Sequence, residues 1–317
     1  MAKLSKLGKK SKRKWSSNKI NEALVNVPET PLQKYYERAT ECANIQYQEG
    51  ITLSSRYCNC RTCLTCSAIR TAKYLNHYSS QMLAFREPVL LTLTKPTVWC
   101  LSPENLRSEI ELMLSIWRLI YQQSRKAKAR RLGISLKGLR SLEVTIRPDN
   151  FYHGHFHLSV EGRANAEWIR DQWLIHFPDA EPWCQDITPI VGKEGLLEVI
   201  KYATKFIGEE TVEIEEIDAD GVVRKVLMKV RKREDPVRTD LIIRAMRGKQ
   251  LISPFGGLKK LEIDDVNKVV QSVTYEELEY AEYRLWRWRG HDWYSNDEER
   301  AKLTTFEPSD AMKRVFE

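Results

Sequence analysis

The stretch Phe151-Tyr-His-Gly-His-Phe-His-Leu-Ser-Val160 holds three of the six histidines of the chain. Successive side chains of a β-strand point to opposite faces. The pattern therefore predicts a strand with Phe151, His153, His155 and His157 on one face and apolar residues on the other. Two neutral imidazoles side by side on one strand can supply two ligands of a metal site. A half-buried strand whose polar face is rich in histidine, without a metal, is the alternative.

A second alternating run, Gly138–Arg147, comes just before this strand. Pro148-Asp-Asn150 between the two runs is typical of a turn, so we expect an antiparallel hairpin. Glu143 would then lie opposite His155 or His157, with Cβ atoms about 5 Å apart. These three side chains would form a cage with open positions that suits Mg²⁺ or Mn²⁺, with Zn²⁺ possible. A register slip of one residue would put Glu143 on the wrong face.

The run Glu194–Ile207 has the apolar spacing of an amphipathic helix. Glu198 and Tyr202 are four residues apart on another face, and Lys205 follows one turn later. A tyrosine phenol can attack a phosphodiester when a cation polarises the phosphate and positive charge favours the phenolate. Tyr202 is therefore the candidate nucleophile, Lys205 the nearby charge, and Glu198 the base for a second attacker, either water or a 3′-hydroxyl. A helix with Glu–Lys pairs and no catalytic part is the alternative.

Four of the seven cysteines fall within Cys58-Asn-Cys-Arg-Thr-Cys-Leu-Thr-Cys66. The basic N-terminus lacks the apolar segment of a secretory signal, so we expect a cytoplasmic protein whose clustered cysteines bind metal. The Cys-x-x-Cys pair that ends the stretch gives two thiolates. Cys58 or Cys60 can supply the third and Cys42 the fourth. Four thiolates suit a structural Zn²⁺; an iron–sulfur cluster and metal-free thiols are the less favoured alternatives.

Several motifs together resemble a known family. His155-Phe-His157 resembles the histidine–hydrophobe–histidine (HUH) motif of rolling-circle replication initiators. Val89–Pro96, with its Leu-Thr-Leu-Thr, is similar to their first motif, and Glu198–Lys205 resembles their third. Arg247–Gly257 is similar to a glycine-rich segment that they carry further on. The resemblance spans about residues 36 to 260 and is closest to plasmid initiators with one catalytic tyrosine and an assisting glutamate.

The resemblance implies a metal-dependent DNA nickase and strand transferase. Tyr202 would cut one strand at the origin, leaving a 5′-phosphotyrosine and a free 3′-hydroxyl primer, and Glu198 would activate water at termination. Origin DNA, single-stranded or cruciform, is the implied substrate, with a host helicase and polymerase as partners. An HUH transposase of the same chemistry and a non-catalytic zinc-containing DNA-binding protein are the alternative functions.

The resemblance also bears on the ligand sets. It favours the zinc ligands Cys42, Cys58, Cys63 and Cys66, and it leaves Cys60 extra. His153 departs from the family pattern, because it adds a third histidine on the same face. It therefore remains a possible auxiliary ligand.

The net charge of +8 and the sequence pI near 9.0 favour an acidic polymer as the partner. No apolar run reaches membrane-spanning length. Basic residues gather in an N-terminal arm, expected to be disordered without DNA, and at the end of a helix expected over 103–131. We expect phosphate contacts from Lys9, Lys10, Lys12, Arg13, Lys14, Lys128, Arg130 and Arg131.

The order β-α-β-β-α-β-α predicts an α+β fold, with a central antiparallel sheet covered by helices. By resemblance this sheet is HUH-type, similar to ferredoxin and RRM folds. In the C-terminal part we expect a charged hairpin, a helix over Tyr275–Arg287, and tryptophans that pack onto the core more than they stack on bases. The expected domains are a basic arm (1–17), a helical four-cysteine zinc module (18–83), the nickase domain (84–210) and a C-terminal hairpin and helical extension that binds DNA (211–317).

Overall fold

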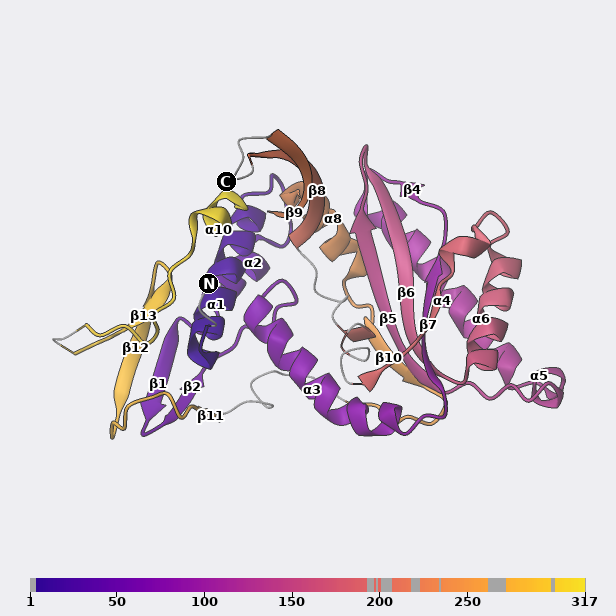
Figure 1. Cartoon of the computed structure of the whole chain (residues 1–317), viewed down its shortest axis with the longest axis horizontal. Helices are drawn as coiled ribbons and strands as arrows, with labels where there is room; N and C mark the ends of the chain where they lie inside the picture. Colours follow the sequence, from indigo (N-terminus) through magenta and orange to yellow (C-terminus); the bar gives the residue numbers. More distant parts are fainter. Residues whose placement is uncertain are drawn as a thin grey trace. The chain divides into compact units, whose positions relative to one another are not determined.

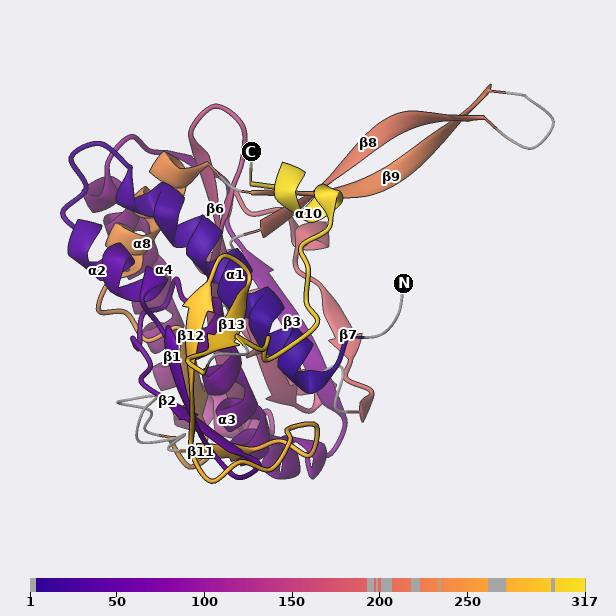
Figure 2. The same cartoon turned by 90° about the vertical axis from the view of Figure 1, so that its left-hand side faces the viewer.

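The computed structural model describes residues 4–192, 197, 199–200, 207–217, 223–233, 235–261, 272–297 and 300–316, with only the backbone of 207–217 and 223–233. The chain divides into two compact units, which interleave along the sequence. The first comprises Met1–Cys66, Lys205–Val237 and Val270–Glu317; the second comprises Ser67–Thr204 and Arg238–Val269. Figure 1 shows both units coloured along the chain, and Figure 2 shows them from the side.

An antiparallel sheet forms the centre of the second unit, in the order β10-β5-β6-β3-β7, and β4 also pairs with β6. The expected hairpin is present as β5 paired with β6, and it lies inside the sheet between β10 and β3. The prediction of an antiparallel sheet covered by helices is therefore confirmed. The strands are β3 (Pro88–Thr94), β4 (Val98–Trp99), β5 (Gly138–Ile146), β6 (Phe151–Glu161), β7 (Ile187–Pro189) and β10 (Ile252–Phe255).

One face of this sheet carries the larger hydrophobic core. Phe156 and Leu158 of β6 are fully buried there against apolar residues of α4, α6 and α8. The Ser102 hydroxyl caps the start of α4 by accepting from the Asn105 amide (3.2 Å). The elements of this layer are α4 (Pro103–Ser124), α5 (Ala127–Arg131), α6 (Arg163–His176) and α8 (Pro236–Met246), followed along the chain from α6 by the short helix η1 (Pro182–Cys184).

The opposite face of the sheet is covered at one end by α3 (Leu64–Leu83). Tyr78 and Met82 of α3 pack with Leu139 of β5 in a second apolar cluster. Val199 and Ile200 belong to the same cluster and are fully buried in it. The segment directly before residue 201 therefore packs on this face and not on the face that α4 and α6 cover.

A five-stranded antiparallel sheet forms the first unit, in the order β11-β2-β1-β12-β13. Trp286 and Trp293 are buried in its core beside Leu53 of β2. Its elements are α1 (Lys6–Val25), α2 (Gln33–Thr40), β1 (Ile45–Glu49), β2 (Thr52–Ser55), β11 (Ser272–Thr274), β12 (Arg284–Arg289), β13 (Asp292–Ser295) and α10 (Asp310–Arg314). The expected charged hairpin is present as β8 (Ile207–Ile217) paired with β9 (Val223–Arg233).

The structure corrects three expectations for this unit. The basic arm is not disordered from Lys6 onward, because α1 buries Leu7, Trp15 and Leu24 against the unit. Tyr275–Arg287 is not a helix; its end is strand β12, where the tryptophans pack as strand residues. The zinc module and the C-terminal extension are not separate domains, because β1 pairs with β12. None of the described helices combines the length and apolarity that crossing a bilayer needs.

Candidate metal centre and histidine cluster

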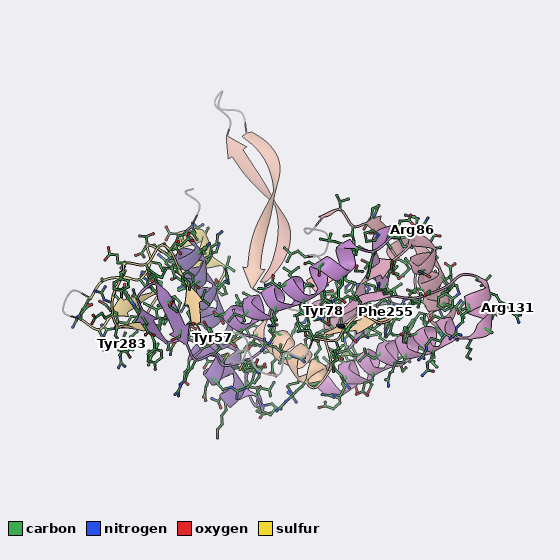
Figure 3. The ribbon with its side chains drawn as sticks, turned by 90° about the horizontal axis from the view of Figure 1, so that it is seen from below. Tyr57, Tyr78, Arg86, Arg131, Phe255 and Tyr283 are labelled. Carbon is green, nitrogen blue, oxygen red and sulfur yellow. The ribbon has the colours of Figure 1, made fainter. Side chains whose placement is uncertain are left out.

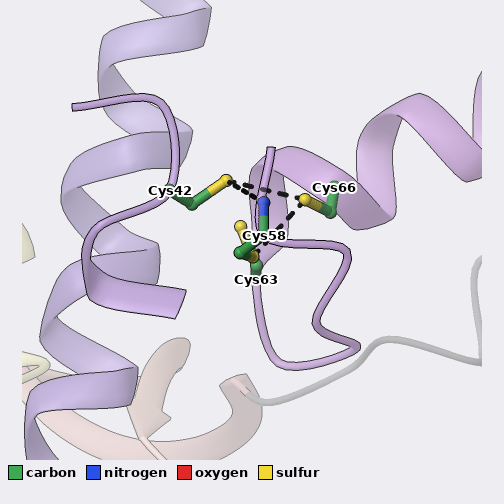
Figure 4. A group of neighbouring side chains, drawn as sticks. All are labelled: Cys42, Cys58, Cys63 and Cys66. Carbon is green, nitrogen blue, oxygen red and sulfur yellow. Dashed lines mark hydrogen bonds between the residues drawn. The ribbon is translucent and has the colours of Figure 1, made fainter. Parts of the chain in front are cut away.

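Four cysteine sulfurs converge in the first unit (Figure 4). The sulfurs of Cys42, Cys58, Cys63 and Cys66 all lie within 4.8 Å of one another. Cys42 and Cys58 each approach the Cys66 sulfur at 3.6 Å. Cys42 comes from the end of the α2 segment, and Cys66 lies on α3, so the cluster joins segments that are far apart in sequence. The four sulfurs can hold a metal ion such as zinc, which prefers tetrahedral thiolate ligands.

Cys60 lies outside this cluster. Its thiol donates to the Tyr35 carbonyl (3.4 Å), and the Arg38 guanidinium donates to its sulfur (3.5 Å). Its backbone amide donates to the Cys58 sulfur at 3.3 Å. Cys60 therefore supports a ligand through its main chain, while its own side chain is turned toward α2. The choice between Cys58 and Cys60, which spacing alone left open, falls on Cys58.

The thiols of the cluster behave as one hydrogen-bonded group. Hydrogen bonds from the Cys42, Cys58 and Cys66 thiols lower the pKa of Cys63 well below its usual value, although burial opposes this. The lowered pKa favours the thiolate of Cys63, which is the form that binds metal. The buried Lys14 ammonium, which donates to the Thr40 carbonyl (2.6 Å), adds positive charge near these sulfurs.

In the second unit, the sheet register brings the predicted histidine cluster together. Glu143 lies directly opposite His155, and Ser141 lies opposite His157. On the other side of β6, Thr94 and Thr92 lie opposite the same two histidines. Because opposed residues of antiparallel strands share a face, all of these side chains belong to one surface of the sheet.

Hydrogen bonds fix the orientation of the histidine rings. His157 Nε2 lies 2.9 Å from Glu143 Oε2, and its Nδ1 lies 3.3 Å from the Thr92 hydroxyl. His155 Nε2 lies 3.1 Å from the Thr145 hydroxyl. The His157–Glu143 distance is that of a hydrogen bond between two buried side chains.

Within the described part of the chain, the cysteine cluster is the only group of three or more Cys, His, Asp or Glu side chains whose ligand atoms converge on one point. His155 does not join Glu143 and His157 in this way, because its Nε2 is directed to Thr145. His155 would have to exchange that hydrogen bond for a metal bond. The cage of Glu143, His155 and His157 with Mg²⁺ or Mn²⁺ therefore stays a prediction.

The surroundings favour the neutral forms of His153 and His155. Burial, followed by the neighbouring His153 and His157, lowers the pKa of His155 to about 3. Burial and the charge of Arg147 also lower the pKa of His153. The rings of His153 and His155 are 4.1 Å apart, and the buried Nδ1 of His153 has no hydrogen-bond partner among the described residues. His153 therefore remains a candidate auxiliary ligand.

The predicted nucleophile Tyr202 and its neighbours Glu198 and Lys205 lie outside the described residues. Val199 and Ile200, which are described, belong to the same apolar cluster as Leu139, and Leu90 packs against that cluster. Leu90 and Leu139 alternate in step with Thr92 and Glu143 on their strands, so they lie on the histidine face. The chain just before Tyr202 is thus placed on the same face of the sheet as the histidine cluster.

The predicted phosphate-binding residues divide into two groups. Lys128, Arg130 and Arg131 are exposed on α5, and Figure 3 shows Arg131 at the outer end of that helix. The prediction for Lys10 and Lys14 is wrong, because both are buried in the first unit. The Lys10 ammonium donates to Gln46 Oε1 (2.7 Å) and lies 5.7 Å from the Trp293 ring centre. Lys9 and Arg13 remain exposed on α1, and Lys12 is half-buried there.

Sequence reasoning missed the partners of the histidines. Thr92 and Thr145 orient the rings, and the Gln185 side chain holds Thr94 through both its backbone amide (2.7 Å) and its hydroxyl (3.1 Å). Leu-Thr-Leu-Thr places a hydroxyl on every second residue of β3, which is the signal that points to these contacts.

Comparison with protein-family models, curated proteins and solved structures found no match.

Proposed function

We propose that this protein is a metal-dependent DNA nickase and strand transferase of the HUH type that initiates rolling-circle replication. The observation that carries the proposal is the shared face of the central sheet. Glu143, His155 and His157 lie together on it, and Val199 and Ile200, just ahead of Tyr202, pack on it. In this proposal, Tyr202 attacks a phosphate held at the histidines.

The chemistry assigned to the residues is a transesterification. Glu143, His155 and His157 would hold a divalent cation, which polarises the scissile phosphate when bound. The Tyr202 oxygen forms a bond to phosphorus, its proton passes to solvent, and the bond from phosphorus to the 3′-oxygen breaks. That oxygen takes up a proton and becomes the primer hydroxyl. Lys205 favours the phenolate, and Glu198 activates the water that later releases the 5′-phosphotyrosine.

The cysteine cluster has a structural part in this proposal. Its thiolates would hold Zn²⁺ and tie the chain after α2 to the Cys58–Cys66 loop within the first unit. Closed sites with four thiolates leave no position open for a substrate. The cluster is therefore assigned to folding and not to catalysis.

The test is the formation of a covalent protein–DNA adduct. Labelled single-stranded oligonucleotides, tiled over the DNA that flanks the coding sequence, are incubated with the full-length protein and Mn²⁺. We expect an adduct that survives denaturation for the wild type and is lost in Tyr202→Phe. Tyr280→Phe, at an exposed tyrosine (82% exposed), is the matched control and should retain the adduct. Glu198→Ala should still form the adduct but accumulate it, because release is impaired.

Two outcomes would count against the proposal. Binding of DNA with no adduct on any oligonucleotide would favour a zinc-containing DNA-binding protein without catalysis. An adduct that persists in Tyr202→Phe would place the nucleophile elsewhere. A transposase would form the same adduct, and the nature of the flanking DNA that is cut separates it from a replication initiator.

A further inference from the structure

Two aromatic residues lie on the histidine face at the turn end of β6. β4 pairs with β6 so that Val98 lies opposite Tyr152, and Trp99 lies opposite Phe151. Tyr152 is buried in the core on the far face, and Val98 packs against that same core. Trp99 and Phe151 therefore point to the other face, which is the face of His153, His155 and His157.

These two aromatics are open to solvent. Trp99 is 56% exposed and Phe151 is 38% exposed, whereas Glu143 and His157 are each only 7% exposed. The face therefore runs from the buried cluster under α3, through the half-buried histidines, to an open aromatic end. Large aromatics left exposed side by side commonly serve recognition, since burying them would stabilise the fold.

A positive charge completes this end of the face. Arg147 directly follows β5, and its backbone amide donates to the Phe151 carbonyl (2.8 Å). Arg147 therefore lies opposite Phe151 on the β5 side of β6, whereas Trp99 lies opposite Phe151 on the β4 side. Arg147 is exposed and forms no ion pair with any described residue.

The backbone around these residues is held in place. The Cys100 amide donates to the Asn150 carbonyl (3.1 Å), which ties the end of β4 to the turn. From the far side, the Arg238 guanidinium donates to the carbonyls of Arg147 and Phe151 and lies 5.4 Å from the Tyr152 ring centre. The two exposed rings and the guanidinium are thus presented by a fixed frame, which lowers the entropy cost of binding.

We propose that Trp99, Phe151 and Arg147 form a stacking platform for the unpaired DNA strand beside the scissile phosphate. This proposal rests on the proposed function for its substrate. Two bases would stack on the aromatic rings, and Arg147 would contact the phosphate between them and the histidine cluster. Single-stranded DNA fits because its bases expose their faces, whereas the bases of a duplex are already stacked on one another. The cluster next to the platform also fixes where the phosphodiester must lie.

The experiment measures DNA binding separately from cleavage. A fluorescein-labelled, mixed-sequence single-stranded oligonucleotide is titrated with full-length protein, without added divalent cation, and its anisotropy is followed. Trp99→Leu and Phe151→Leu should each weaken binding by about 5- to 150-fold, the range that loss of one stacked base gives. Trp99→Tyr, which keeps an aromatic face, should restore most of the affinity. Tyr283→Leu changes an exposed aromatic in the other unit (64% exposed; labelled in Figure 3) and should leave binding unchanged.

Three results would overturn the platform. The first is unchanged single-strand binding in both leucine variants. The second is an equal loss for a duplex of the same sequence. The third is concentration-dependent self-association that Trp99→Leu abolishes while DNA binding stays intact, because a second copy of the chain would then be the occupant. An adduct from the nicking assay together with unchanged binding rejects the platform alone. Weakened binding in a protein that forms no adduct keeps the platform and rejects the nickase.

Discussion

At the scale of single residues, Cys58 and Cys60 show how neighbouring thiols acquire different tasks. Their spacing in sequence allows either one as a ligand, but only the Cys58 sulfur lies in the four-sulfur cluster. We expect Cys58→Ser to lose bound zinc and Cys60→Ser to retain about one zinc per chain, as four-thiolate sites hold one ion. Zinc released by a thiol-modifying reagent and measured with a chromogenic chelator gives the ratio. Equal loss from the two variants would contradict the assignment.

His155 gives a prediction about pH. Its pKa falls from an unfolded value near 6.5 to about 3 on folding. Between these values the unfolded chain binds more protons, so stability rises with pH across this window and is flat above it. His155→Gln should therefore reduce the loss of stability on going from pH 7 to pH 5, by up to about 1.4 kcal/mol per pH unit for one proton. Urea unfolding at both pH values in buffer without Mg²⁺ or Mn²⁺ measures it; an unchanged difference between the two pH values would contradict the assignment.

At the scale of elements, local patterns predicted the second unit well. Alternation and the Pro148–Asn150 turn determine the β5–β6 register, because a slip of one residue would bury the histidines and expose Phe156 and Leu158. That register is what places Glu143 opposite His155. The prediction from local pattern was wrong for α1, where closely spaced lysines suggested a basic arm that is disordered without DNA. Lys10 and Lys14 are buried there because a carbonyl, an amide oxygen and aromatic rings accept their ammonium groups.

The prediction of secondary structure was also wrong for the C-terminal segment. A helix was expected over Tyr275–Arg287, but the segment ends in strand β12. β12 pairs with the adjacent β13 and also with β1, more than two hundred residues earlier in the chain. A partner that distant leaves no local signal, and tertiary context overrides weak strand preference. The helix predicted to carry Tyr202 stays a prediction, since Tyr202 lies outside the described residues.

At the scale of the whole molecule, the cysteine cluster and the histidine cluster lie in different units. Cys42, Cys58, Cys63 and Cys66 all belong to the first unit, whereas Glu143, His155 and His157 belong to the second. The second unit has its own hydrophobic cores on both faces of its sheet, and neither contains a cysteine of the cluster. Removal of zinc should therefore loosen one unit and spare the other.

Amide hydrogen exchange tests this separation, since exchange reports opening of individual elements. After treatment with a zinc chelator, protection should fall in α1, β1 and β12 and persist in β5, β6 and β3. Bonds from zinc to the four thiolates would act as folding contacts of the first unit. Removal of the zinc leaves buried sulfurs that repel one another when ionised. Cys66→Ser should reproduce the pattern without chelator, and Cys100→Ser, at a buried cysteine of the second unit, should not. A loss of protection spread evenly over both units would mean that the zinc site supports the whole chain and not one unit.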